Sequence, residues 1–319
     1  MNVLEVDIII NRREVMGYKC KVSVALLTYN HEEYISQSIE SALMQKCDFD
    51  YEIVIGEDCS TDRTREIVKR YKEKYPDKIK LVLHEKNVGS VENEFSVFSN
   101  CEGEYIAYLE GDDYWIDENK LQMEVDFLEN NKDYSACYTD TQLFSDEERM
   151  YKTYKVHKED ICTFEEFYET TPLIPTGTFL FRRSSLGNNF RVYYDDAPKF
   201  ISDKTIMCLN LKYGKIKYID KKTSVYRCIL NGKNSFCSHD EIYKFKDYIQ
   251  SLRVQRKIVP KEKRHIVDDE IAFYQKTVVK YSFAGKEYSS GLKYILFNTS
   301  LGEKFRVITC RANRQVWPQ

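Results

Sequence analysis

The chain lacks several features that would define its class at once. It contains six prolines among 319 residues, and it has no internal repeat and no low-complexity segment, so neither a Pro-rich linker nor a repeat fold is expected. No apolar stretch reaches the roughly 18 residues that a membrane-spanning helix needs, and no charged and then apolar segment marks a secretory leader. With 42% hydrophobic residues the chain can nevertheless bury a substantial core. We therefore expect a globular, cytoplasmic protein.

The ten cysteines form no C-x-x-C pair. His157 and Cys162 are residues of the right type for zinc, but they have no partners at zinc-binding spacing. Reduced thiols are therefore expected, as in cytoplasmic proteins. The sequence also lacks the patterns G-x-x-x-x-G-K-[ST] and G-x-G-x-x-G, so neither a P-loop nor a dinucleotide-binding fold is supported.

Positive charge shows no excess over the chain as a whole, with 48 Lys and Arg residues against 51 Asp and Glu residues. The net charge is −3, which argues against a nucleic-acid-binding protein. From residue 240 onward, however, 16 Lys and Arg residues stand against 9 Asp and Glu residues. This basic end has two interpretations: a solvated helical face, or a patch that contacts the anionic inner face of a membrane.

Short apolar runs alternate with helical patterns over the first 140 residues. The runs that predict buried strands are 22–27, 51–55, 79–83, 105–109 and 135–139. The segments with helical spacing are 31–45, 62–75, 91–99 and 117–130. This alternation predicts an α/β fold with a mostly parallel central sheet and helices on both faces.

The second half of the chain is less regular. The pattern predicts a capped helix start at 163–168, a strand at 177–182, a helix at 201–213 and short strands at 216–219 and 224–227. After about residue 238 the sequence is helical and rich in Lys, Tyr and Glu. We interpret it as a helical appendage packed on the body of the protein.

Polar clusters follow three of the predicted strands. They are LTYN at 27–30, GEDCSTD at 56–62 and EGDD at 110–113. In a parallel sheet the carboxyl ends of the strands meet at one edge, and ligands bind in the crevice there. Each cluster alone is equally typical of a turn, but the occurrence of all three favours a shared binding site.

The cluster at 110–113 places Glu110, Asp112 and Asp113 within four residues. Carboxylates this close repel one another, and removing them from water costs free energy. A hard divalent cation, Mg²⁺ or Mn²⁺, offsets this repulsion and typically binds one or two carboxylates together with substrate phosphates. The sequence therefore predicts a divalent-cation cofactor.

Four ordered motifs resemble those of the family 2 glycosyltransferases. They are VSVALLTYNHEEYISQSIESALMQ, YEIVIGEDCSTDRT, NVG, and GEYIAYLEGDDYW with KLQMEVDFLE after it. The resemblance is dense over 21–138 and thinner over 174–186 and 202–227. It implies the Rossmann-like GT-A fold, the nucleotide-sugar-binding fold of these enzymes, with the C-terminal helical appendage added to it.

The resemblance also suggests how the chain is divided. Residues 1–20 would be an N-terminal extension and residues 21–237 the GT-A domain. Within that domain, residues 21–140 would bind the nucleotide sugar and residues 141–237 the acceptor. Residues 238–319 would form the C-terminal helical region.

Individual roles in donor binding follow from the matching positions. Leu27, Thr28 and Tyr29 would line the nucleobase pocket, and Asp58 would accept a hydrogen bond from the base, most simply from N3–H of uracil. The other residues that the resemblance assigns to the nucleotide sugar are Glu57, Asn93, Glu110, Asp112 and Arg227.

Roles in metal binding and catalysis are implied in the same way. Asp112 and Asp113 would hold the metal, with Asp113 on the ion that bridges the diphosphate. Asp203 matches the family's catalytic base, although an Asp that opens a helix is also a common N-cap. Arg227 would be a cation near the phosphates or acceptor, or a member of a structural salt bridge.

Three departures from the family's pattern are visible. The chain has Glu57, Asp58 and Cys59 where two Asp and a Gly are usual. The first acid of the metal motif is Glu110 rather than Asp, and Ile229 stands where a His is often found. The details of the base pocket and the metal ligands are accordingly open.

The function that the resemblance implies is transfer of a sugar, with inversion, from a nucleoside diphosphate to an acceptor hydroxyl. The donor would be a UDP-sugar and the acceptor a glycan or lipid-linked glycan of the bacterial surface. Two alternatives remain: a metal-dependent nucleotidyltransferase, which would normally show a Gly-rich basic loop after its first strand, and an inactive nucleotide-sugar- or glycan-binding module. No nucleic-acid partner is expected.

Overall fold

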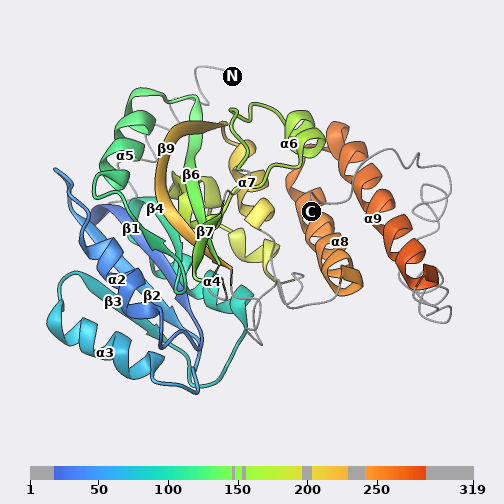
Figure 1. The fold of residues 1–319 in the computed structure, drawn as a ribbon. Helices are drawn as coiled ribbons and strands as arrows, with labels where there is room; N and C mark the ends of the chain where they lie inside the picture. The colour runs from blue at the N-terminus through green and yellow to red at the C-terminus, as the bar shows by residue number, and fades with distance from the viewer. Residues whose placement is uncertain (1–17, 146–147, 153–155, 196–202, 229–240, 285–319) are drawn as a thin grey trace.

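Figure 1 shows the computed structural model of the protein, which describes residues 18–145, 148–152, 156–195, 203–228 and 241–284. Four of the predictions concern residues outside these ranges. They are most of the N-terminal extension, the start of the helix predicted at 201, the departure at Ile229 and the tail beyond 284. Among the helices of the described ranges, none is long and apolar enough to cross a membrane.

A sheet of nine strands forms the centre of the molecule, in the order β3-β2-β1-β4-β8-β6-β9-β5, with β7 paired to β6. Its first half comprises β1 (Cys20–Thr28), β2 (Tyr51–Glu57), β3 (Ile79–Leu83) and β4 (Gly103–Glu110). The pairs within this half are parallel. Strands β1, β2 and β4 are buried along most of their length, and burial on both faces explains why their sequences are continuous apolar runs.

Helices cover both faces of this sheet, as the alternating pattern predicts (Figure 1). The apolar sides of α2 (Ile35–Leu43), α3 (Thr64–Lys74) and α5 (Lys120–Asn130) share one core with one face of the sheet. Helices α4 (Ser90–Asn100) and α7 (Asp203–Leu211) contribute to the core on the other face. The predicted fold class, a sheet with helices on both faces, is confirmed.

The second half of the sheet contains antiparallel pairs and differs in part from the prediction. It consists of β5 (Tyr114–Trp115), β6 (Tyr134–Ser145), β7 (Met150–Lys152), β8 (Phe179–Arg182) and β9 (Lys215–Cys228). Strand β8 is antiparallel to both β4 and β6. The two short strands predicted at 216–219 and 224–227 are wrong as separate elements, because β9 runs through both. Its exposed polar residues 220–222 resemble a turn, but register shifts around Asp140 of β6 keep the two strands paired.

Short helices connect these strands. Helix α6 (Phe164–Thr170) opens with a capping box between Thr163 and Glu166, as the sequence predicts. The single-turn helix η1 (Thr176–Thr178) replaces the start of the strand predicted at 177. Two more, η2 (Arg183–Leu186) and η3 (Phe190–Tyr193), follow β8, whereas η5 (Lys261–Lys263) lies within the C-terminal helical region.

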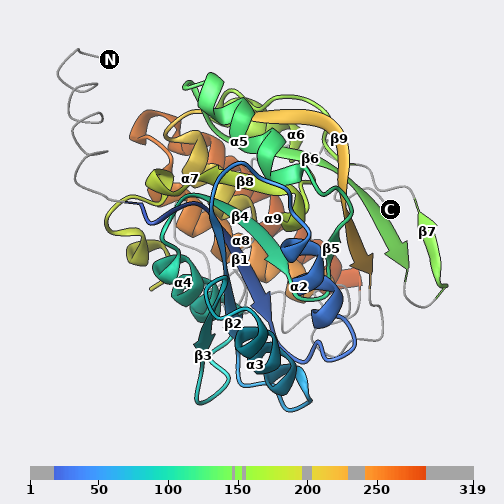
Figure 2. The ribbon, with the colours of Figure 1, turned by 90° about the vertical axis from the view of Figure 1, so that its left-hand side faces the viewer.

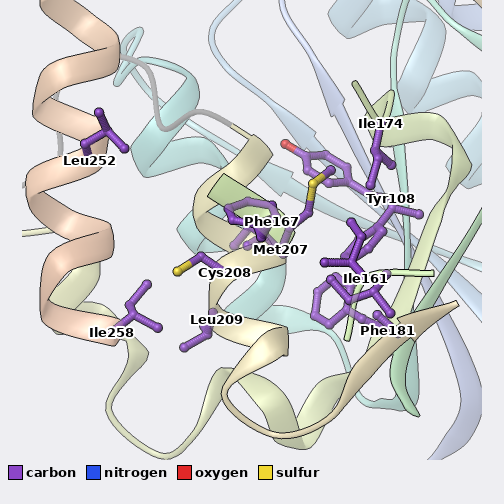
Figure 3. Packing of buried hydrophobic residues seen from close by; sticks show 14 of the residues in the cluster. Tyr108, Ile161, Phe167, Ile174, Phe181, Met207, Cys208, Leu209, Leu252 and Ile258 are labelled. Carbon is purple, nitrogen blue, oxygen red and sulfur yellow. The ribbon is translucent and has the colours of Figure 1, made fainter. Parts of the chain in front are cut away.

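The C-terminal appendage consists of α8 (Glu241–Ile258) and α9 (Arg264–Ala284). Figure 3 shows Leu252 and Ile258 of α8 facing Cys208 and Leu209 of α7, and these four side chains are buried in the same cluster. That cluster also contains Tyr108 and Phe181 of the sheet. The appendage therefore completes the core on the α4/α7 side of the sheet, as expected of a packed helical region.

Candidate active site

The sheet register brings the three polar clusters together at one edge. Leu27 of β1 pairs with Glu110 of β4, and the next residue, Thr28, pairs with Glu57 of β2. The segments that follow these residues therefore leave the sheet side by side. The prediction that three separated stretches of sequence share one edge is confirmed by this geometry.

Hydrogen bonds join the loop after β1 to the loop after β2. Asn30 has a φ of 56°, and its side-chain oxygen accepts from the Thr61 N–H (2.8 Å) while its own N–H donates to Ser60 Oγ (3.0 Å). The His31 N–H donates to Thr64 Oγ1 (2.8 Å). Since Asn tolerates the left-handed conformation and Ser, Thr and Asn bond to nearby backbone, the polar residues of both clusters act partly as turn chemistry.

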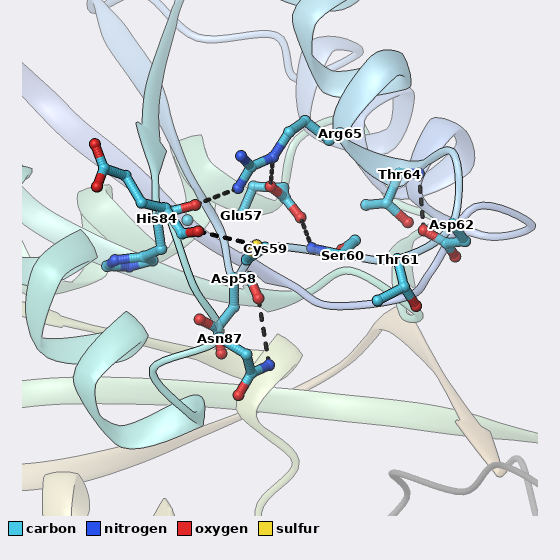
Figure 4. Close-up of polar contacts among 12 residues, drawn as sticks. Glu57, Asp58, Cys59, Ser60, Thr61, Asp62, Thr64, Arg65, His84 and Asn87 are labelled. Atoms are coloured by element: carbon cyan, nitrogen blue, oxygen red, sulfur yellow. Dashed lines mark hydrogen bonds and ion pairs between the residues drawn. The ribbon is translucent and has the colours of Figure 1, made fainter.

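Glu57 is fully buried and its charge is balanced within the protein (Figure 4). One carboxylate oxygen accepts from the Ser60 N–H (2.6 Å) and the other forms an ion pair with Arg65. Arg65 also donates to the His84 carbonyl (2.5 Å). Because both oxygens of Glu57 already have partners, its carboxylate holds the loop after β2 in place.

Asp58 lies beside the loop after β3. Its two carboxylate oxygens accept from the N–H groups of Val88 (2.7 Å) and Gly89 (2.9 Å). Burial raises the pKa of Asp58, and these two hydrogen bonds oppose the rise. The next residue, Cys59, has a φ of 56°, a conformation that suits glycine better, so the Gly usual at this position in the family matches the backbone here.

Asn93 is buried and faces β2 rather than open solvent. Its amide donates to the Gly56 carbonyl (3.0 Å), and its oxygen lies 3.2 Å from His84 Nε2. A Cβ on Gly56 would come within 2.4 Å of Asn93 Oδ1, so the absence of a side chain there allows α4 to approach the strand. Leu27 and Thr28 are also buried, whereas Tyr29 is partly exposed.

The acidic turn after β4 is held against the end of β1. Gly111 donates its N–H to the Leu27 carbonyl (2.7 Å), and a Cβ at Gly111 would lie 2.7 Å from both His31 Nδ1 and Thr28 Oγ1. Asp113 is 3% exposed, while Asp112 remains partly open and its Oδ2 lies 3.9 Å from His31 Nε2. Gly111, which lies between Glu110 and Asp112, thus permits this turn. A residue with a side chain at this position would have to displace His31 or Thr28.

The acidic side chains of this turn are crowded, which makes negative charge on them costly. Loss of hydration, and next the repulsion from Asp112, raises the pKa of both Glu110 and Asp113 well above the ordinary range. Asp203 adds to the repulsion on both, so it lies near enough to interact with the turn. Crowded carboxylates of this kind fit a hard divalent cation, which would lower the free energy of their charged forms.

No three His, Cys, Asp or Glu side chains within the part of the chain that the structure describes are already grouped to hold a metal ion. The carboxylates of Asp112 and Asp113, at the acidic turn, are the oxygen donors that this edge offers to a cation. This matches the chemistry of Mg²⁺ or Mn²⁺, which usually takes its remaining ligands from water and substrate phosphates.

Arg227, near the end of β9, fastens the acidic turn from the other side. Its backbone N–H donates to Asp113 Oδ1 (2.8 Å), and its guanidinium donates to the Asp112 carbonyl (3.1 Å) and to the side chain of Gln37. The guanidinium carbon lies 5.0 Å from the ring centre of Tyr34 and 4.7 Å from that of Tyr114. Arg227 therefore lies at the acidic turn, in contact with both Asp112 and Asp113.

Asp203 is the first residue of α7 and its side chain is open to solvent. Dense protein around it removes part of its hydration and raises its pKa to about 6. The structure thus brings Asp203 to the acidic turn from about 90 residues further along the chain, and both of its predicted roles, helix cap and base, remain compatible with this position.

Another buried carboxyl group, not among the predicted site residues, lies near the turn. Glu94 of α4 accepts hydrogen bonds from the hydroxyls of Tyr108 (2.5 Å) and Tyr194 (2.6 Å). Burial raises its pKa to about 7, although the two hydroxyls oppose the rise. The sequence holds one signal for it: Glu94 falls on the helix face of Val97 and Phe98, where an apolar residue is expected.

The fold of the described residues is of the GT-A class, the class of the solved structures that it resembles. Residues 23–190 match the family model "Glycosyl transferase family 2". The chain belongs to glycosyl transferase family 2, and the resemblance seen in the sequence is confirmed.

The chain is also similar to individual known proteins. The chain is 35% identical over 112 residues to the "Putative teichuronic acid biosynthesis glycosyltransferase TuaG" of Bacillus subtilis, which is 35% of this chain and 43% of that one. The fold of this chain resembles that of S. aureus TarS 1–349 in complex with UDP-GlcNAc. The TM-score is 0.58 with 21% identity, over 91% of this chain and 79% of that one.

A second solved structure with this fold is the mannosyltransferase PcManGT of Pyrobaculum calidifontis in complex with GDP-Man and Mn²⁺. Its TM-score is 0.56 with 17% identity, over 92% of this chain and 80% of that one. The chain aligns with 34%, about a third, of the length of the first curated relatives that it matches.

Proposed function

We propose that the protein is an inverting glycosyltransferase that moves a sugar from a nucleoside diphosphate to an acceptor hydroxyl. The observation that carries this proposal is the convergence of the ends of β1, β2 and β4 with Asp203 of α7 around one acidic turn. A diphosphate with a bound cation would complete the charge balance of that turn, and Asp203 would be the proton acceptor.

The donor would lie across the carboxyl ends of β1 and β2. Leu27, Thr28 and Tyr29 would line the base pocket, where the partly exposed ring of Tyr29 can pack on the base. Asp58 would accept a hydrogen bond from the base with the lone pairs that Val88 and Gly89 leave free. The UDP-GlcNAc bound by a protein of the same fold supports a UDP-sugar.

Some of the remaining residues would contact the donor or its cation, and others would hold the pocket in shape. Asp112 and Asp113 would hold the divalent cation, which when bound supplies charge stabilisation for the leaving diphosphate. Glu110 and Arg227 would contact the nucleotide sugar at the edge of the same turn. Glu57 and Asn93 would support the pocket through the hydrogen bonds that fix the loop after β2 and the position of α4.

Asp203 would act as the general base. In a single-step displacement the base removes the acceptor proton on the face opposite the leaving group, which gives inversion at the anomeric carbon. A carboxylate with a pKa of about 6 is still charged at neutral pH, and it is a stronger base than an ordinary Asp. Its open side chain leaves room for an acceptor hydroxyl.

The setting that we propose is the synthesis of a bacterial surface polysaccharide or lipid-linked glycan. The name of TuaG, which refers to teichuronic acid biosynthesis, supports this class of acceptor. Within the chain, residues 21–140 would handle the donor and residues 141–237 the acceptor. The protein would act in the cytoplasm, and its basic C-terminal region could contact the inner face of the membrane.

Ligand-dependent thermal stability tests this proposal. UDP, GDP, and the corresponding triphosphates should be compared with and without Mn²⁺, using wild type and Asp113→Ala. We expect a nucleoside diphosphate with Mn²⁺ to stabilise wild type by about 2.7 kcal/mol at a hundredfold excess over Kd, and a chelator or the substitution to remove this effect. Stabilisation that survives the chelator would contradict the metal assignment. Turnover of triphosphates with pyrophosphate release would indicate a nucleotidyltransferase instead.

A further inference from the structure

The hairpin of β6 and β7 presents an exposed aromatic surface next to the candidate active site. All three residues of β7 are exposed, with Met150 at 49% and Tyr151 at 51%. Figure 2 shows β7 at the rim of the sheet, beside the end of β6. Met150 and Tyr151 are therefore open to a ligand at this rim.

A continuous chain of contacts leads from this surface to the acidic turn. The hydroxyl of Tyr151 lies 3.1 Å from the hydroxyl of Tyr114. The ring of Tyr114 in turn lies 4.7 Å from the guanidinium of Arg227, and the backbone N–H of Arg227 donates a hydrogen bond to Asp113. Two residues, Tyr114 and Arg227, therefore connect the hairpin to Asp113.

The ring of Tyr151 is held in one orientation although it is exposed. Phe144 of β6 packs against it with ring centres 5.1 Å apart and an interplanar angle of 62°. The hydrogen bond between the Tyr151 and Tyr114 hydroxyls fixes the other end of the ring. An aromatic ring fixed in this way loses little conformational entropy when a ligand covers its open face.

We propose that Tyr151, supported by Tyr114 and Phe144, is the subsite that binds a sugar ring of the acceptor. A pyranose has an apolar face of C–H groups that packs on an aromatic ring, and hydroxyls at its edge that bond to a tyrosine hydroxyl. The position favours this ligand over a peptide or a second copy of the chain, because an acceptor hydroxyl must be delivered beside the acidic turn. This inference rests on the proposed function.

Direct binding of simple pyranosides tests the subsite. The probes are the methyl β-glycosides of glucose, galactose and N-acetylglucosamine, observed by saturation-transfer NMR on the full chain with UDP and Mn²⁺ present. We expect a signal with wild type that falls at least fivefold in Tyr151→Ala and is largely kept in Tyr151→Phe, which retains the ring. Tyr213→Ala is the matched control, since Tyr213 is also 51% exposed but lies at the turn after α7.

The outcomes separate this inference from the proposed function. Equal signals for Tyr151→Ala and Tyr213→Ala, or no signal with wild type, would overturn the subsite. So would a wild-type dimer that Tyr151→Ala dissociates without any pyranoside signal, because the surface would then be a contact between copies. Stabilisation by UDP in the same samples reports on donor binding, so its loss would remove the transferase proposal while a pyranoside signal at Tyr151 would stand.

Discussion

At the scale of single residues, the acids of the site differ in how their charges are balanced. Glu57 is paired with Arg65, whereas Glu110, Asp112 and Asp113 repel one another. Sequence proximity alone gives no sign of this difference, because Arg65 lies in a helix and is brought to Glu57 by the turn after β2. The unbalanced group is the one that fits a cation and a diphosphate.

Arg65→Ala should therefore destabilise the protein strongly. It would leave the fully buried carboxylate of Glu57 without its cation, a change that typically costs 3–5 kcal/mol. Chemical denaturation measures the loss in the free energy of unfolding. The double variant Glu57→Gln/Arg65→Met, which removes both charges, should recover much of it. If the single substitution costs less than about 1 kcal/mol, the pair does not hold the loop as described.

Asp203→Asn should lower the rate of sugar transfer by about 10²–10⁴-fold while donor binding stays intact, since only proton removal is lost. In wild type, kcat should fall as the pH drops below about 6, the pKa of Asp203, because the protonated carboxyl cannot act as a base. Initial rates across pH 5–8 measure both effects. An unchanged rate in Asp203→Asn would leave the helix cap as its role.

At the scale of elements, the parallel half of the sheet follows from the sequence and the other half only in part. Strands β1, β2 and β4 are predictable to within a few residues because burial on both faces demands an apolar run. The three residues of β7 are all exposed and carry no such pattern. Glu94 could not be assigned a role, because its partners Tyr108 and Tyr194 come from β4 and from the end of η3.

The contact of Glu94 with both tyrosines joins α4, β4 and η3, and it should make stability depend on pH. The pKa of Glu94 is about 7 in the folded protein, above the ordinary value of about 4.3 for an unfolded chain. The unfolded state therefore ionises first, and the free energy of unfolding should decrease as the pH rises from about 4.5 to 7. The decrease attributable to Glu94 is about 3 kcal/mol.

Denaturation of wild type and Glu94→Gln across this pH range measures that contribution. The difference between the two proteins should shift in favour of the Gln variant as the pH rises, because an amide does not titrate. A constant difference from pH 4.5 to 7 would show that the carboxyl group of Glu94 has an ordinary pKa.

At the scale of the whole molecule, the C-terminal helices and the sheet share one core. Leu252 of α8 is fully buried in the cluster that includes α7 and β8. Leu252→Ala should cost 2–5 kcal/mol and lower the cooperative melting transition of the whole chain. Two separate transitions, with only one affected, would instead show that the appendage folds independently of the catalytic body.

The measurement that tests the central claim most directly is the release of UDP from UDP-sugars by the full chain with Mn²⁺ and a pyranoside acceptor. We predict acceptor-dependent UDP release by wild type, at least a hundredfold less with Asp113→Ala or Asp203→Asn, and a product with inverted anomeric configuration by NMR. Release that is equal in wild type and both variants, or a product with retained configuration, would contradict the account.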